Sequence, residues 1–183
     1  MGILFTTGGS FSEAPNTLAG QSLKAIFRLN KYLYRFTNIY VKHKLDLFDK
    51  LILPILKYGN EVWDFHPGNS VKKVHLQFYK RLLGVKKCTQ NDFVYGELGR
   101  TSLRCQRLNN IVKDWIKIVN SSEQKYVKII YNLLYNDMLD KPTCVNWCTL
   151  LRYLLCSLDL EEVWMYQSVG NKSTLLMLML KKE

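Results

Sequence analysis

The sequence predicts a mainly α-helical protein, a multi-helix bundle preceded by one short strand. Apolar residues recur every three or four positions through most of the 183 residues, which is the period of a helix with one buried face. Glycine or proline stands between the periodic segments, where helices commonly end. Residues 3–7, before Gly8 and Gly9, are typical of a strand, and a lone strand needs a partner for its backbone groups. We therefore expect a short N-terminal β-strand remnant beside a helical bundle.

The first helix is expected to begin at Ser12 or Asn16, with Pro15 in its first turn, and to run to about Phe36. At 100° per residue it carries two opposite stripes. The apolar stripe, which we expect to be buried, is formed by Ile26, Leu29, Leu33 and Phe36. The basic stripe is formed by Lys24, Arg28, Lys31 and Arg35. One face can therefore join a core while the other presents four cations, either to solvent or to a partner.

The later helices follow from the same period. Their expected ranges are 41–57, 70–83, 101–119, 123–139 and 146–158, and residues 91–98 are expected to form a short turn or a helix. Pro54 should kink or end the second helix, because proline lacks an N–H and clashes with the preceding turn. Gly59 and Gly84 are typical helix stops, and residues 61–66 form a predicted connector. Residues 161–183 have only a weak helical pattern.

The net charge of +11 is concentrated in one part of the chain. Residues 21–120 hold 19 Lys or Arg against seven Asp or Glu, whereas residues 121–183 hold seven of each sign. We therefore predict a basic helical region over residues 1–120 and a C-terminal helical extension over residues 121–183. A concentration of this kind favours a polyanionic partner, most often nucleic acid, and the alternative is a solvated basic surface without a specific partner.

The candidate nucleic-acid-binding residues are the cations that periodicity places on exposed faces or in loops. They are Lys24, Arg28, Lys31, Arg35, Lys72, Lys73, Lys80, Arg81, Lys86, Lys87, Arg100, Arg104 and Arg107. Tyr32, Tyr34 and Tyr79 lie between them, and their rings could either stack on bases or fill the core.

Sequence motifs for catalysis or cofactor binding are absent. There is no P-loop, dinucleotide fingerprint, HExxH motif or Gly-x-Ser-x-Gly elbow. Cys144 and Cys148 could share a helix face, but core thiols are a better interpretation than a zinc site, which needs two further ligands. Asp46 and Asp49 are typical of ion-pair partners on a helix. We expect no cofactor and no metal.

The sequence also predicts the compartment. No signal peptide is visible, and no apolar run approaches the length needed to span a bilayer. The five cysteines are an odd set and are expected to be reduced, buried thiols. We therefore expect an intracellular protein, cytoplasmic or nuclear, that is neither secreted nor membrane-bound; its oligomeric state is left open.

Several blocks, in this order, resemble the region after the catalytic palm in LINE-type (non-LTR) retrotransposon reverse transcriptases of the jockey/CR1-like kind. The blocks are Gly2–Phe5 (GILF), Leu47–Trp63 (LFDKLILPILKYGNEVW), His75–Val85 (HLQFYKRLLGV), Tyr95–Arg100 (YGELGR) and Trp164–Gly170 (WMYQSVG). The chain departs from the family pattern at Asn60, Asp64 and Ser102, where Cys, Gly and Pro are usual, and after Gly170. We expect the extension to be truncated at its end.

The resemblance implies the thumb and C-terminal region of an RNA-directed DNA polymerase. Such a thumb is a helical unit that holds the RNA or DNA template–primer duplex by its backbone. The resemblance begins inside the strand that follows the palm, so we expect the palm and its [Phe/Tyr]-Ala-Asp-Asp motif to be absent. A fragment of this kind would not be an enzyme, and its partners would be the duplex and a palm supplied in trans. The alternative is a helical interaction or structural protein whose basic charge has no nucleic-acid role.

Overall fold

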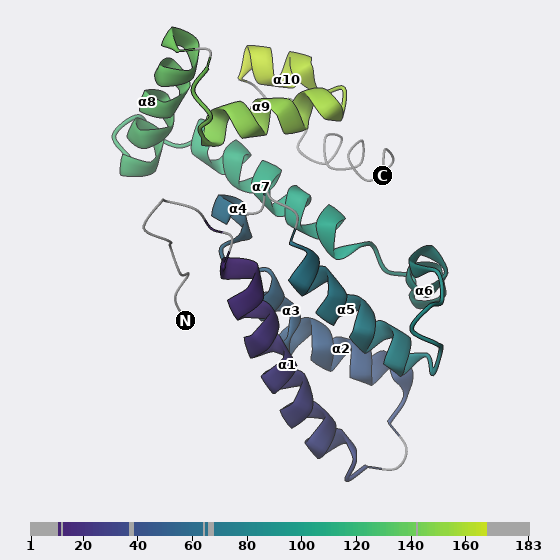
Figure 1. Ribbon diagram of the computed structural model, residues 1–183. Coiled ribbons are helices and arrows are strands. Elements are labelled where there is room, and N and C mark those ends of the chain that lie inside the picture. The colour runs from purple at the N-terminus through teal and green to yellow at the C-terminus, as the bar shows by residue number, and fades with distance from the viewer. Residues whose placement is uncertain are drawn as a thin grey trace. The chain divides into compact units, whose positions relative to one another are not determined.

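The computed structural model describes residues 11, 13–36, 39–63, 65, 68–141 and 143–167. All regular secondary structure in these ranges is helical, which confirms the prediction of a mainly α protein (Figure 1). The strand predicted over residues 3–7 and the weakly helical stretch after residue 167 lie outside the described residues.

The chain forms two compact units, residues 1–106 and residues 107–183. The division lies inside one continuous helix, α7 (Leu103–Val119), whereas the charge pattern predicted a change at residues 120 and 121. The first unit carries 16 Lys or Arg and seven Asp or Glu, and the second carries ten and eight. Most of the excess positive charge therefore belongs to the first unit.

The described residues of the first unit form six helices before the start of α7. They are α1 (Ala14–Leu33), α2 (Val41–Leu51), α3 (Leu53–Leu56), α4 (Asn60–Trp63), α5 (Asn69–Leu82) and α6 (Asn91–Leu98). Pro54 is the second residue of α3, so the helix predicted over residues 41–57 divides at Ile52 as proline chemistry requires. The predicted connector after Gly59 is wrong in part, because residues 60–63 form the short helix α4.

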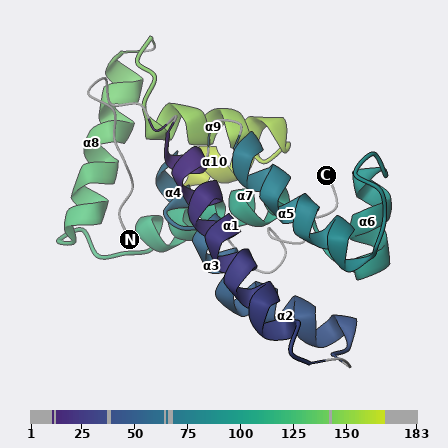
Figure 2. The same cartoon turned by 60° about the horizontal axis from the view of Figure 1, so that its bottom comes forward.

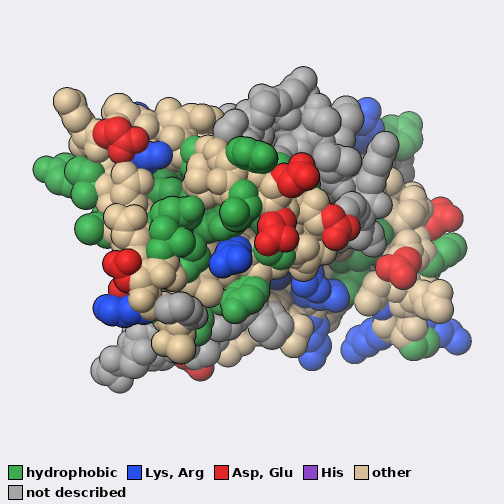
Figure 3. All heavy atoms as spheres, turned by 90° about the horizontal axis from the view of Figure 1, so that it is seen from above, with side chains coloured by type: hydrophobic (Ala, Val, Ile, Leu, Met, Phe, Trp, Pro, Cys, Tyr) green, Lys and Arg blue, Asp and Glu red, His purple; other side chains and the backbone are tan. Residues whose placement is uncertain are grey.

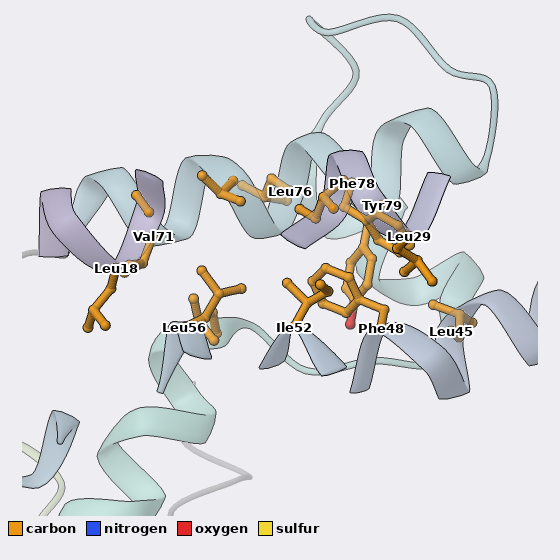
Figure 4. Close-up of a cluster of buried hydrophobic side chains, with 14 of the residues drawn as sticks. Leu18, Leu29, Leu45, Phe48, Ile52, Leu56, Val71, Leu76, Phe78 and Tyr79 are labelled. Atoms are coloured by element: carbon orange, nitrogen blue, oxygen red, sulfur yellow. The ribbon is translucent and has the colours of Figure 1, made fainter. Parts of the chain in front are cut away.

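The core of the first unit lies between α1 and α5 on one side and α2 and α3 on the other (Figure 4). Leu18 and Leu29 come from α1, and Val71, Leu76, Phe78 and Tyr79 come from α5. The ring of Phe48 on α2 is fully buried and stacks on Phe78, with 4.1 Å between the ring centroids. This packing fixes which face of α5 is inside, and therefore which face is available at the surface.

The second unit is built from most of α7 together with α8 (Tyr126–Asp140), α9 (Trp147–Ser157) and α10 (Glu161–Tyr166) (Figure 2). Its core contains Trp115 and Trp164, whose ring centroids are 5.8 Å apart. The indole N–H of Trp115 donates to the hydroxyl of Tyr131 at 3.1 Å. Asn146 caps α9 by accepting from the backbone N–H of Thr149 at 3.0 Å.

One residue that was predicted to be buried on the apolar stripe of α1 is exposed in the structure. Ile26 and Leu29 are buried and Leu33 is partly buried, as the apolar stripe predicted. Phe36, however, is 64% exposed. The helix ends at Leu33, so Phe36 no longer follows the helical period that would have turned its ring toward the core.

Candidate nucleic-acid interface

A groove of about 380 Å³ runs along the outer face of α5 and is rich in lysine and arginine. Its lining residues are Asn69, Lys72, Lys73, Leu76, Gln77, Lys80, Arg81, Val85 and Lys87. Five of these are predicted nucleic-acid-binding cations, and none of the described residues that line the groove is acidic. We call this feature the basic groove.

Helix periodicity explains why these side chains share one face. Asn69, Lys72, Leu76 and Lys80 follow one another at spacings of three and four residues, which places them in one row. The opposite face of α5, with Val71, Val74 and Phe78, packs into the core. Within the row, Leu76 is also buried, whereas Lys72 is exposed. Charge and spacing predicted the cations of the groove, but Asn69, Leu76, Gln77 and Val85 were not predicted, although the same spacing marks the first three.

The loop after α5 closes one end of the groove. Gly84 adopts a left-handed backbone with φ of +68°, which ends the helix and turns the chain back. The Lys80 ammonium donates to the carbonyl oxygens of Lys87 and Thr89, at 2.9 and 2.6 Å. Lys80 therefore fastens this loop to α5, and its charge supports the groove from a partly buried position.

Ten of the thirteen predicted cations are exposed. They are Lys24, Arg28, Lys31, Arg35, Lys72, Lys73, Arg81, Lys86, Lys87 and Arg104. The first three lie on the outer face of α1, and Arg35 follows the end of that helix. Lys86 and Arg104 are exposed but do not line the basic groove.

Arg100 is held by an ion pair within the first unit. Its guanidinium lies 2.6 Å from a carboxylate oxygen of Asp49, and both side chains are largely covered, at 32% and 23% exposure. The predicted role of Asp49 as an ion-pair partner is thus confirmed. Burial raises the pKa of the neighbouring Tyr79, and the Asp49 carboxylate adds to the rise.

Arg107 was predicted to be an accessible cation, and this prediction is wrong. Only 3% of its surface is exposed. Leu103 and Ile111, four residues before and after it on α7, are fully buried. Positions four apart share a helix face, so Arg107 belongs to the inner face of α7. A side chain in this position does not reach a phosphate on the surface.

In the described ranges no group of three or more His, Cys, Asp or Glu residues is arranged to hold a metal ion. Cys148 is fully buried, and burial raises the pKa of its thiol to about 12, which agrees with a core thiol at this position. Cys144 is only partly buried and Cys88 is exposed, so the expectation of buried thiols is wrong for Cys88. Within the same described part, none of the helices combines the length and apolar character required to cross a bilayer.

Comparison of the chain with protein-family models, with curated proteins and with solved structures gave no match.

Proposed function

We propose that this chain binds nucleic-acid duplex through the phosphate backbone, as the non-catalytic thumb region of a non-LTR retrotransposon RNA-directed DNA polymerase. The observation that carries the proposal is the basic groove, which gathers Lys72, Lys73, Lys80, Arg81 and Lys87 on one side of α5. The sequence blocks that resemble LINE-type reverse transcriptases support the assignment to a polymerase. In this context a palm, supplied elsewhere, performs the chemistry, and the thumb keeps the template–primer in place.

The composition of the basic groove favours phosphate over base recognition. Lysine ammonium groups act as point charges toward phosphate oxygens and carry no sequence information of their own. Leu76 and Val85 supply apolar surface between them, which suits the sugar edge of a backbone better than the polar edge of a base. Binding of this kind is insensitive to sequence and sensitive to salt, because each phosphate contact releases a condensed counterion.

The proposal is tested by fluorescence anisotropy with a labelled primed RNA template. The groove variant is Lys72→Glu/Lys73→Glu/Arg81→Glu, three exposed cations that line the basic groove. Its control is Lys113→Glu/Lys125→Glu/Arg152→Glu, three exposed cations of the second unit with the same change in net charge. We expect the groove variant to lose at least tenfold in affinity, about the effect of two or three lost phosphate contacts, and the control to lose much less.

Equal losses in the two variants would show that only net charge matters, and the groove would have no special role. Primer extension by the purified wild-type chain would contradict its assignment as a non-catalytic region. Circular dichroism of each variant checks that the fold is retained, which is expected because all six side chains are exposed.

A helical interaction protein with incidental charge is the second candidate, and exposed apolar residues of the second unit favour it. Tyr126, Ile130 and Leu133 follow the helical period on α8 and are 84%, 56% and 63% exposed. Hydrophobic side chains lie among polar ones over α8, at the left of Figure 3. Large exposed apolar patches often mark protein contacts. This candidate predicts no measurable affinity for the primed template.

A further inference from the structure

A second hollow in the first unit, of about 650 Å³, lies where the ends of α1 and α5 meet the first turn of α2. Its apolar wall is formed by Leu33, Phe78 and Leu82, which also pack against the core. Lys44 and Arg81 supply two cations at its edge, and Asn30 supplies a side-chain amide. We call it the aromatic hollow, because Tyr34 and Phe36 complete its lining.

The two aromatic rings of this hollow are unusually exposed. Tyr34 is 92% exposed and Phe36 is 64% exposed. Tyr34 is the C-cap residue of α1, and Phe36 lies beyond the end of that helix. A phenyl ring kept in water loses the stabilisation that burial would provide. Flat apolar rings beside cations are the combination that binds unpaired bases, since the rings stack on the base and the cations hold the phosphate.

Arg81 connects the aromatic hollow to the basic groove, because its side chain lines both. A strand whose phosphates follow Lys72, Lys73 and Arg81 would therefore continue into the aromatic hollow. A base inside the duplex cannot use such a ring, because both of its faces are already stacked on neighbouring base pairs. The occupant that fits is an unpaired nucleotide next to the duplex end.

We infer that the aromatic hollow binds an unpaired nucleotide of a single-stranded segment adjoining the bound duplex, by stacking its base on Tyr34 or Phe36. Arg81 and Lys44 hold the flanking phosphates, and the Asn30 amide can bond the edge of the base. This inference rests on the proposed function, and it adds that the chain distinguishes a duplex with a single-stranded tail from a blunt one.

The test compares a short blunt RNA–DNA duplex with the same duplex carrying a single-stranded RNA tail. We expect wild type to bind the tailed duplex at least roughly fivefold more tightly, the lower end of what one base–aromatic stack contributes. Tyr34→Ala/Phe36→Ala should lose this preference and keep its affinity for the blunt duplex. Tyr34→Phe/Phe36→Tyr, which retains both rings, should keep the preference. Tyr126→Ala, at a similarly exposed tyrosine of the second unit, is the matched control.

A photochemical readout locates the contact directly. Iodouridine placed at the first unpaired position of the tail should cross-link to the peptide that contains Tyr34 and Phe36, identified by mass spectrometry. Equal affinity of wild type for the two duplexes, a preference that survives Tyr34→Ala/Phe36→Ala, or a cross-link elsewhere would overturn the inference and leave the proposed function standing. Failure of wild type to bind either duplex would instead overturn the proposed function itself.

Discussion

At the scale of single residues, Tyr131 connects three elements of the second unit through its hydroxyl. It accepts from the Trp115 indole at 3.1 Å and donates to the side-chain oxygen of Gln167 at 2.5 Å. Trp115 is fully buried, so loss of this hydroxyl leaves its N–H without the acceptor. We expect Tyr131→Phe to lower the free energy of unfolding by about 1–3 kcal/mol, measured by urea denaturation. Tyr126→Phe, at an 84% exposed ring, should change it by less than about 0.5 kcal/mol.

The Tyr131 hydroxyl should also make the free energy of unfolding decrease at high pH. Burial raises the pKa of Tyr131 to about 12 from an ordinary value of 10.0. The unfolded state therefore releases this proton first, and the stabilisation present below pH 10 is lost as the pH rises to about 12. The difference in unfolding free energy between wild type and Tyr131→Phe should narrow over that interval. A difference that stays constant would show that the hydroxyl ionises normally in the folded protein.

Arg100 and Arg104 are four residues apart, and the structure gives them different surroundings. Arg100 pairs with Asp49, whereas Arg104 is exposed. Arg100→Ala should lower the free energy of unfolding by about 1–2 kcal/mol, between the values for exposed and buried pairs. Arg104→Ala should lower it by less than about 0.5 kcal/mol. In a double-mutant cycle, Asp49→Asn should reduce the effect of Arg100→Ala, and additive effects would exclude a stabilising pair.

These arginines show that charge and helical spacing do not determine whether a cation is exposed, paired or buried. Arg100, Arg104 and Arg107 were predicted to lie on one exposed side of the helix, because spacings of four and three residues separate these cations. The structure pairs the first, exposes the second and buries the third. The burial of Arg107 had a sequence signal, since it lies midway between Leu103 and Ile111 in a row of four-residue spacings. The partner of Arg100 is 51 positions away in sequence and becomes a neighbour only through the fold.

At the scale of elements, the outer face of α1 carries Lys24, Arg28 and Lys31 in one exposed row. If the duplex also contacts this row, Lys24→Gln/Arg28→Gln/Lys31→Gln should weaken binding to all duplex sequences alike. The slope of log affinity against log salt should then become shallower by about 0.9 for each lost contact. Glutamine keeps the helix propensity close to that of lysine and arginine, so α1 should stay folded.

The control for this row is Lys113→Gln/Lys125→Gln/Arg152→Gln in the second unit, which removes the same charge. An unchanged slope in the α1 variant would exclude the row from the interface. The proposal that the basic groove binds the duplex would be unaffected, because its own test changes different residues.

Helices with several turns were predictable from the sequence, and shorter features were not. The predicted range 91–98 coincides with α6, and 70–83 differs from α5 by one residue at each end. Gly84 and Gly99, both with left-handed backbones, mark these two ends. The four residues of α4 span barely one turn and carry no readable period, so they were assigned to a connector. Phe36 was misplaced for a related reason, because the pattern was extended beyond the end of α1.

At the scale of the whole molecule, the division into two units had no sequence signal. Gln106 and Arg107 are consecutive residues inside α7, without a glycine, proline or polar linker between the units. The residues that line the basic groove could be predicted only in part. Charge and spacing identify the cations of α5, whereas the loop that returns Val85 and Lys87 to the groove depends on three-dimensional packing.

The salt dependence of the intact chain decides between the two candidate functions. Seven exposed cations lie on the outer face of α1 or line the basic groove, namely Lys24, Arg28, Lys31, Lys72, Lys73, Arg81 and Lys87. If each contacts one phosphate, log affinity should fall against log salt with a slope of about −6, since each contact contributes about −0.9. Duplexes of different sequence should bind alike, because backbone contacts carry no base information. Anisotropy titrations at several salt concentrations measure both properties, and a slope near zero would contradict backbone binding and favour a helical interaction protein.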